Sequence, residues 1–248
     1  MSDLEAAVLA GGLGRRFRPY TEMVPKHMLP LGLSEKPLLE YIVRWLASEG
    51  VKKVALLVGY KWRYIYNYFG RGERFNIDIS YSIDDDVYKG TGGALLKAFK
   101  ENVLKGNEAL IWYGDILALV PIPKLVEFHF RLKANATLVY SPRYQVPVGV
   151  LEERNGIVES VREKPWLPLK TFIGVAIVER DSIVRASGEL GYSFDIMGDL
   201  IPWMLNRGYR VAAFEYNGPW YDVGSLERYE KIDPDVIEKL ERELKLVD

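Results

Sequence analysis

The sequence predicts an α/β protein in which a mainly parallel sheet is flanked by helices and carries a small antiparallel insertion. Short apolar runs alternate with longer amphipathic runs through the first half of the chain, which is the pattern of βα units. An Asn-Gly pair between two short β-rich runs indicates a hairpin in the second half. The 248 residues contain no repeat, low-complexity tract or linker, so we expect residues 1–248 to form one domain.

In the first half, strands and helices are expected to alternate. The apolar run at 4–10 predicts the first strand, and apolar side chains recur at helical spacing over 37–49, with Pro37 in the first turn and Gly50 just past the end. The next expected elements are a strand at 53–58, a short helix at 62–69, a strand at 77–83, a helix at 92–100, a strand at 109–113 and a helix at 121–132. Ligands of such sheets bind at the carboxyl ends of the strands.

The second half is expected to contain the antiparallel insertion. A strand at 136–140 precedes two runs, at 148–151 and 157–161, that flank Arg154-Asn155-Gly156. An Asn-Gly pair is typical of a two-residue hairpin turn. A strand at 172–178, helices at 181–186 and 199–206, a strand at 210–214 and a charged helix at 234–245 complete the expected order.

Composition excludes several classes of function. The 33 Lys and Arg residues against 34 Asp and Glu give a net charge of −1, so no overall field attracts nucleic acid or an anionic membrane. The absence of cysteine excludes thiolate catalysis and Cys-ligated metals, and only His27 and His129 could serve histidine chemistry. The chain opens with the acidic Met-Ser-Asp-Leu-Glu and contains no membrane-spanning apolar run, so we expect a cytoplasmic protein.

A glycine-rich, basic loop follows the first expected strand. It reads Gly11-Gly12-Leu13-Gly14-Arg15-Arg16, and residues 11–30 hold four Lys or Arg against one Glu, a local charge of +3. Glycines let phosphate oxygens approach the backbone, and arginines bind them bidentately. The loop is neither a dinucleotide fingerprint, because Phe17 stands where the third glycine is needed, nor a P-loop. A glycine turn with solvated arginines is the alternative.

The order of motifs resembles that of the sugar-1-phosphate nucleotidylyltransferases, also called nucleotide-sugar pyrophosphorylases. The motifs are Leu9-Ala10-Gly11-Gly12 with Gly14 and Arg16, Pro25-Lys26, Gly90-Thr91-Gly92-Gly93-Ala94, Tyr113-Gly114-Asp115, Glu163-Lys164-Pro165 and Trp220-Tyr221-Asp222-Val223-Gly224. They cover essentially the whole chain. The sequence departs from the family pattern at Arg15, His27, Tyr113 and Phe172, where the family carries Thr or Ser, Pro, Asn and Asn.

This resemblance implies the Rossmann-like nucleotide-diphospho-sugar transferase fold and a reaction between two phosphates. A sugar-1-phosphate oxygen attacks the α-phosphorus of a nucleoside triphosphate (NTP), which gives an NDP-sugar and pyrophosphate. The resemblance makes Arg16, Lys26 and Asp115 catalytic, with Asp115 and Asp222 as ligands of Mg²⁺. No general base is needed, because a phosphate monoester is already ionised at neutral pH. We therefore expect His27 to be a loop residue.

The resemblance also assigns binding residues. Those expected at the nucleotide are Leu9, Ala10, Gly11, Gly12, Gly14, Arg15, Gly90 and Thr91, and those expected at the sugar phosphate are Gly149, Glu163, Lys164 and Phe172. Without the family, Asp115 and Asp222 would be interpreted as turn or capping residues, and Glu163 with Lys164 as a surface ion pair.

The stretch around Thr91 is closer to guanylyltransferases, so we predict GTP and mannose-1-phosphate or a related sugar phosphate as substrates. The alternatives are a glucose-1-phosphate thymidylyl- or uridylyltransferase and a non-catalytic regulatory paralogue that binds nucleotide-sugar. Residues 84–86, all Asp, could accept hydrogen bonds from guanine or form a solvated acidic turn. No nucleic acid or membrane partner is expected. Many relatives carry a C-terminal β-helix, and this sequence ends before such an element could begin. We therefore expect a monomer or a homodimer formed through the catalytic domain.

Overall fold

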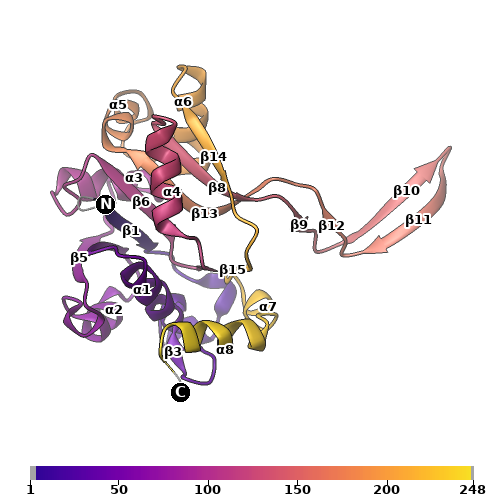
Figure 1. Cartoon of the computed structure of the whole chain (residues 1–248), viewed down its shortest axis with the longest axis horizontal. Helices are drawn as coiled ribbons and strands as arrows, with labels where there is room; N and C mark the ends of the chain where they lie inside the picture. The colour runs from indigo at the N-terminus through magenta and orange to yellow at the C-terminus, as the bar shows by residue number, and fades with distance from the viewer. Residues whose placement is uncertain (1–3, 247–248) are drawn as a thin grey trace.

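A seven-stranded sheet lies between two layers of helices in the computed structural model, which describes residues 4–246 (Figure 1). The strand order is β14-β8-β13-β6-β1-β4-β5. The strands are β1 (Glu5–Ala10), β4 (Lys53–Val58), β5 (Asp78–Ile83), β6 (Glu108–Tyr113), β8 (Ala136–Ser141), β13 (Thr171–Glu179) and β14 (Val211–Glu215). Only β13 runs antiparallel to its neighbours in this sheet, which confirms the predicted fold class.

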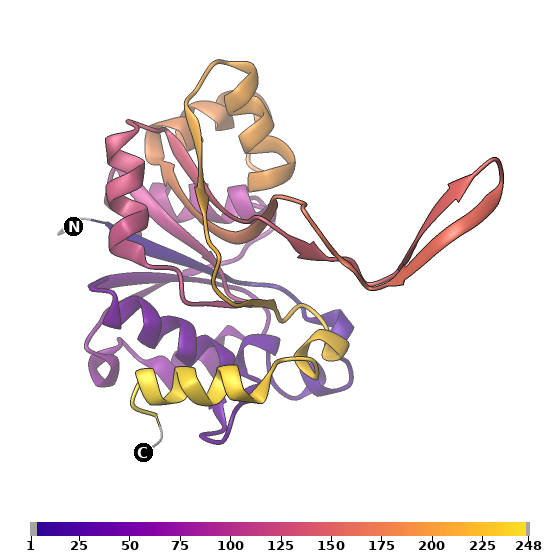
Figure 2. The ribbon, with the colours of Figure 1, turned by 45° about the vertical axis from the view of Figure 1, so that its right-hand side comes forward.

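Helices cover both faces of the sheet, as the two views in Figures 1 and 2 show. Ala6 and Val8 of β1 pack in one core with α1 (Leu38–Ser48), α2 (Trp62–Phe69) and α4 (Ile122–Arg131). Ala7 packs on the opposite face with α3 (Gly90–Lys100), α5 (Arg180–Leu190) and α6 (Ile201–Asn206). Because successive side chains of a strand point to opposite faces, burial on both faces explains the continuous apolar runs.

Several boundaries differ from those expected. The strand at 53–58 and the helix at 62–69 are confirmed, but α3 begins at Gly90 rather than 92, because the amides of Gly92 and Gly93 donate to the carbonyl of Phe194 at 2.9 and 3.1 Å. The helix α5 continues to Leu190 rather than ending at 186, and a π-helical turn, η5 (Ile196–Leu200), precedes α6.

The hairpin predicted at Asn155-Gly156 forms an arm that projects from the body (Figure 2). Its strands are β10 (Gly149–Arg154) and β11 (Ile157–Glu163), so the second strand is longer than expected. Asn155 and Gly156 have φ of 53° and 80°, the left-handed conformation that a type I′ turn requires. The short strands β9 (Tyr144–Gln145) and β12 (Trp166–Leu167) pair with each other and join the arm to the sheet.

The sequence did not predict several short elements of the fold. They are the 3₁₀ turns η1 (Arg15–Phe17), η2 (Tyr20–Glu22), η3 (Lys26–Met28) and η4 (Glu73–Phe75), the strands β2 (Pro30–Leu31), β3 (Lys36–Pro37), β7 (Ile116–Ala118) and β15 (Trp220–Asp222), and the helix α7 (Leu226–Tyr229). The last helix, α8 (Pro234–Glu243), packs through Ile237 and Leu240 on Phe17 and Leu38, in a third core.

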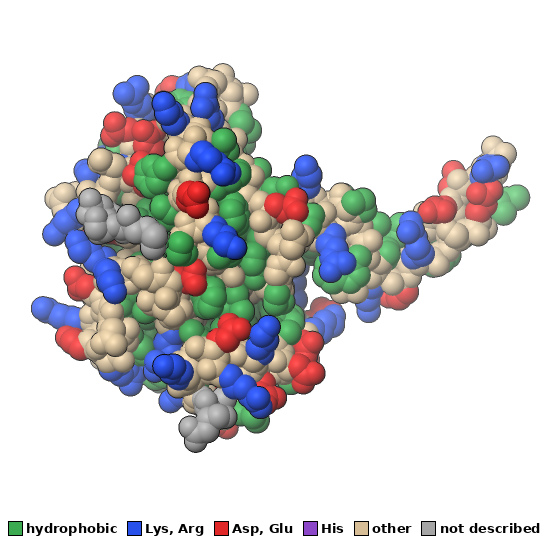
Figure 3. Space-filling model, in the orientation of Figure 1, with side chains coloured by type: hydrophobic (Ala, Val, Ile, Leu, Met, Phe, Trp, Pro, Cys, Tyr) green, Lys and Arg blue, Asp and Glu red, His purple; other side chains and the backbone are tan. Residues whose placement is uncertain are grey.

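The composition predicted that no charge of one sign dominates the surface and that no segment spans a membrane. On the face seen in Figure 3, basic and acidic side chains are interspersed, as the near-zero net charge suggests. Within residues 4–246, the helices are too short and too polar to cross a bilayer. Residues 1–3, part of the acidic start of the chain, lie outside the described residues.

Candidate functional site

A cavity of about 410 Å³ opens at the carboxyl ends of β1, β4, β5 and β6, where the sequence predicted a ligand site. It brings together seven of the residues that the resemblance implicated: Leu9, Gly11, Gly12, Lys26, Gly90, Thr91 and Asp115. Other predicted residues do not line it. Ala10 is buried in the sheet, Gly14, Arg15 and Arg16 lie farther along the loop, and Arg15 and Arg16 are exposed.

Two glycines of the loop are required for different reasons. Gly14 has φ of +62°, and a Cβ there would lie 2.8 Å from Thr21 Cγ2, whose hydroxyl donates to the Gly14 carbonyl at 3.0 Å. A Cβ on Gly11 would lie only 2.1 Å from Asp84 Oδ2. Gly11 therefore leaves room for a carboxylate at the end of β5, a close approach that the sequence analysis did not anticipate.

Lys26 and Asp115 form an ion pair in the wall of the cavity. Lys26 Nζ lies 2.5 Å from Asp115 Oδ2, and the two side chains are only 13% and 19% exposed. Burial by itself would raise the pKa of Asp115, but the charge and hydrogen bond of Lys26 outweigh burial and hold that pKa below its usual value. Asp115 is therefore ionised at neutral pH, as a metal ligand or phosphate-site carboxylate needs to be.

Asp222 is brought beside Asp115 by the pairing of β15 with β7. Asp222 pairs with Ile116 in this antiparallel ladder, and the Val223 amide donates to the Asp115 carbonyl at 2.7 Å. A Cβ on Gly224 would lie 2.6 Å from Asp222 Oδ1 and 3.1 Å from Arg16 Nη2. The fold thus places both predicted metal ligands and the guanidinium of Arg16 in one region.

These residues fit a magnesium ion. Mg²⁺ usually binds through one or two carboxylates and completes its shell with phosphate oxygens and water. In the part of the chain that the structure describes, no group of three or more His, Cys, Asp or Glu side chains gathers into a metal-binding cluster. Two carboxylates on adjacent backbone segments, near the Arg16 guanidinium of the glycine-rich loop, meet the requirement of Mg²⁺.

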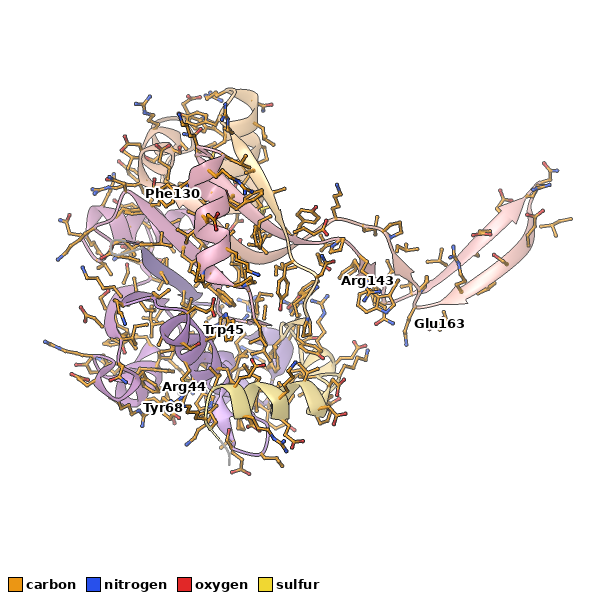
Figure 4. All side chains as sticks on the ribbon, in the orientation of Figure 1. Arg44, Trp45, Tyr68, Phe130, Arg143 and Glu163 are labelled. Atoms are coloured by element: carbon orange, nitrogen blue, oxygen red, sulfur yellow. The ribbon has the colours of Figure 1, made fainter. Side chains whose placement is uncertain are left out.

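The predicted sugar-phosphate residues of the arm lie outside the cavity. Gly149 pairs with Glu163 at the root of the arm, where Figure 4 labels Glu163. Lys164 Nζ lies 3.6 Å from Glu163 Oε1 with both side chains exposed, so the surface ion pair is present. The charge of Lys164 also helps, after the hydrogen bond and charge of Lys231, to lower the pKa of Glu227 in α7.

Two departures from the family pattern pack on each other. The rings of Tyr113 and Phe172 meet edge to face with centroids 5.8 Å apart, and Tyr113 lines the cavity whereas Phe172 does not. Since an aromatic ring replaces asparagine at both positions, the two changes together form one contact. Tyr113 therefore gives the cavity a more apolar lining than asparagine would, while Phe172 packs against the ring of Tyr113.

His27 is a buried residue of η3. It is 1% exposed, its ring lies against Gly114, and its Nδ1 has no hydrogen-bond partner within the described structure. Burial, and then the charge of Lys26, lower the pKa of His27 to about 3. Such a weakly basic imidazole suits a packed loop residue better than a general base.

The sequence analysis missed two polar residues of this region. Asp195 lines the cavity, and its Oδ1 accepts hydrogen bonds from the Thr91 amide at 2.9 Å and the Thr91 hydroxyl at 3.1 Å. Arg228 forms an ion pair with Asp222. Arg228 could have been suspected from the sequence, because a basic residue six positions after Asp222 can reach that carboxylate. The contact between Asp195 and Thr91 could not, because these residues lie 104 positions apart.

Known proteins resemble this chain over nearly its whole length. A family model described as nucleotidyl transferase matches residues 5–239. The D-glycero-alpha-D-manno-heptose 1-phosphate guanylyltransferase of Aneurinibacillus thermoaerophilus is 38% identical over 92% of this chain and 96% of its own length. The UTP–glucose-1-phosphate uridylyltransferase of a Synechocystis strain is 28% identical over 91% of this chain, which spans only 61% of that enzyme.

The fold has close structural relatives. The crystal structure of HddC from Yersinia pseudotuberculosis, complexed with GMP-PN, superposes with a TM-score of 0.73 at 23% identity, over 94% of this chain and 99% of that one. At this identity the likeness shows the fold alone. The family model extends over nearly the whole chain and includes the loop, Lys26, Asp115 and Asp222. The chain therefore belongs to the nucleotidyl transferase family, as its order of motifs predicts.

Proposed function

We propose that this nucleotidyltransferase transfers a guanylyl group from GTP to mannose-1-phosphate or a related sugar phosphate and releases pyrophosphate. Two relatives support the choice of substrates. The 38% identical Aneurinibacillus protein is named as a heptose 1-phosphate guanylyltransferase, and a Mycobacterium tuberculosis protein, 27% identical over 95% of this chain, as a mannose-1-phosphate guanylyltransferase.

The position of Asp84 carries the proposal of guanine. Asp84 lines the cavity, and its carboxylate lies between Gly11 and Gly59. A Cβ on Gly11 would lie 2.1 Å from Asp84 Oδ2, and a Cβ on Gly59 would lie 2.2 Å from it. Guanine offers two adjacent donors, N1–H and N2–H₂, that one carboxylate can accept, whereas uracil and thymine offer a single ring N–H. Within the described residues, this carboxylate accepts no hydrogen bond from the protein; burial raises the pKa of Asp84, and the charge of Lys97 opposes that rise.

The neighbouring Asp85 has a structural role instead. Its Oδ1 accepts hydrogen bonds from the amides of Val87 and Tyr88, both at 2.8 Å, and its Oδ2 lies 3.4 Å from Lys97 Nζ. The acidic turn considered from the sequence is therefore built by Asp85. Because Asp85 lines the cavity, the matched control for Asp84 is Asp86, whose side chain is fully exposed and does not line it.

The chain's own groups suit a reaction between two anions. Lys26 would contact the α-phosphate and the attacking phosphate, and Arg16 would stabilise the charge that develops on the leaving pyrophosphate. Mg²⁺ held by Asp115 and Asp222 would neutralise phosphate oxygens and help to align them. The neutral His27 removes no proton, because the attacking oxygen is already ionised.

Pyrophosphate release tests the proposal. Purified protein would be assayed with Mg²⁺, five nucleoside triphosphates and the 1-phosphates of mannose, heptose and glucose. We expect release with GTP and a manno-configured phosphate, a loss of GTP preference of about 10- to 100-fold in Asp84→Asn, and a change under about threefold in the control Asp86→Asn. Release with UTP or dTTP and glucose-1-phosphate supports that alternative, and tight nucleotide-sugar binding without release supports the regulatory paralogue.

The setting of the enzyme belongs to the same proposal. We infer that it acts in the cytoplasm as a monomer or a homodimer, without nucleic acid or membrane partners. Light scattering of the purified protein at assay concentration checks the oligomeric state.

A further inference from the structure

Each of the two carboxylates proposed to hold Mg²⁺ is paired with a cation of the chain itself. Lys26 occupies Oδ2 of Asp115, and Arg228 occupies Oδ2 of Asp222. The role of Lys26 follows from the family motif, but nothing so far accounts for Arg228. A divalent cation bound to the Asp222 carboxylate repels the nearby guanidinium and neutralises the negative charge that holds it, so metal binding weakens this ion pair.

The two ion pairs differ in their exposure to water. The Lys26–Asp115 side chains are 13% and 19% exposed, whereas those of Arg228 and Asp222 are 40% and 35% exposed. An ion pair as exposed to solvent as Arg228–Asp222 is weakly held, because water screens both charges. Arg228 can therefore leave Asp222 at little cost when a divalent cation arrives.

The surroundings of Arg228 favour a phosphate as its next partner. The Ser225 side chain caps the first turn of α7 and fixes the backbone of Arg228 there. Arg16 is close to Asp222, since a Cβ on Gly224 would lie 3.1 Å from Arg16 Nη2 and 2.6 Å from Asp222 Oδ1, and the charge of Lys164 acts on Glu227, the neighbour of Arg228. A guanidinium that is released among these cations meets the anionic substrate with a bidentate fork that suits phosphate.

We propose that Arg228 is a positioning residue that holds Asp222 before metal binding and then transfers to a phosphate group of the substrate. The metal ion and Arg228 thus compete for Asp222 in the free enzyme and act together in the substrate complex. This inference rests on the proposed function, since it takes Asp222 to be a metal ligand and a phosphate to be the ligand.

The test separates the two halves of the exchange. Mn²⁺, which binds the same oxygen ligands as Mg²⁺ and has an EPR signal, is titrated into substrate-free protein. We expect Arg228→Gln to bind Mn²⁺ about two- to fivefold more tightly, because the competing cation is gone. The same variant should show a KM raised about tenfold or more for the substrate whose phosphate Arg228 contacts. A raised KM for GTP identifies the triphosphate, and a raised KM for the sugar phosphate identifies the other anion.

Variants with related charge changes provide the controls. Arg228→Lys keeps the charge without the fork, so its Mn²⁺ affinity should remain close to that of the wild type while the KM stays raised. Arg242→Gln removes another exposed Arg–carboxylate pair, that with Glu238 on α8, and should leave both measurements unchanged. The single variant Asp222→Asn should bind Mn²⁺ more weakly than the wild type does.

The possible failures are distinguishable. Unchanged or weaker Mn²⁺ binding in Arg228→Gln, with a normal circular dichroism spectrum, overturns the competition, and tighter Mn²⁺ binding without any change in KM overturns the transfer to phosphate. If Asp222→Asn leaves Mn²⁺ affinity intact and the wild type releases no pyrophosphate, the proposed function itself has failed.

Discussion

Replacing Lys26 by Met removes the cation from a nearly buried ion pair and leaves the Asp115 charge behind. Breaking such a pair from one side typically costs about 3–5 kcal/mol. The side chains of Lys26 and Asp115 retain 13% and 19% exposure, so we expect a loss of about 2–4 kcal/mol in the free energy of unfolding at pH 7. For a chain of this size that corresponds to a decrease in Tm of about 5–15 °C.

The pH dependence of this loss has a defined sign. In the wild type the pKa of Asp115 is lowered, so its contribution is present above the unfolded value of about 3.9 and is lost as the pH falls through the lower folded value. Without Lys26, only His27 and a backbone hydrogen bond oppose burial, so the pKa of Asp115 is higher than in the wild type. The difference in stability between wild type and Lys26→Met should therefore shrink as the pH falls from 7 to below 4.

Urea denaturation of a double-mutant cycle measures the effect. The set comprises wild type, Lys26→Met, Asp115→Asn and the double variant, with a coupling energy of about 2–3 kcal/mol expected. Arg242→Gln, which breaks an exposed pair on α8, serves as a control and should cost under about 0.5 kcal/mol. A coupling energy near zero, or a Lys26→Met penalty as large at pH 4 as at pH 7, would refute the reasoning.

Four further outcomes are expected. Asp115→Asn should lose about 100-fold or more in kcat and keep its circular dichroism spectrum; retained turnover would remove Asp115 from the site. His27 has a pKa of about 3 in the folded protein and about 6.5 in the unfolded chain. Its protonation in the unfolded chain should therefore lower the free energy of unfolding by up to about 1.4 kcal/mol per pH unit as the pH falls from 6.5 towards 3. His27→Leu should flatten this pH dependence in urea titrations. Glu241→Gln weakens hydrogen bonds from Ser34 and Tyr41 and should cost about 1–3 kcal/mol in calorimetry, with KM for GTP unchanged. Gly59→Ala should displace Asp84 and reduce GTP preference in competition assays, whereas equal preference would contradict the role of Asp84.

Much of the fold could be predicted because its signals are local. The strand at 53–58 and the helix at 62–69 have the bounds that their apolar periodicity indicates, and the turn at Asn155-Gly156 follows from the left-handed conformation that these two residues tolerate. The position of the cavity was also predictable, since the basic glycine loop directly follows a strand of a parallel sheet. Boundaries were less predictable where distant contacts set them, as Phe194 does for the start of α3.

The sequence by itself determined the family, the fold class and the chemical type of the site, because the order of motifs and the periodicity of burial are written along the chain. Only the tertiary structure decided which charges meet. Asp222 reaches Asp115 through two three-residue strands, β7 and β15, that are too short to leave a periodic signal. The pairing of Lys26 with Asp115 and the room made for Asp84 by two glycines likewise depend on contacts between segments far apart in sequence. Ion pairs and close approaches follow from distances in space, and local sequence patterns do not specify those distances.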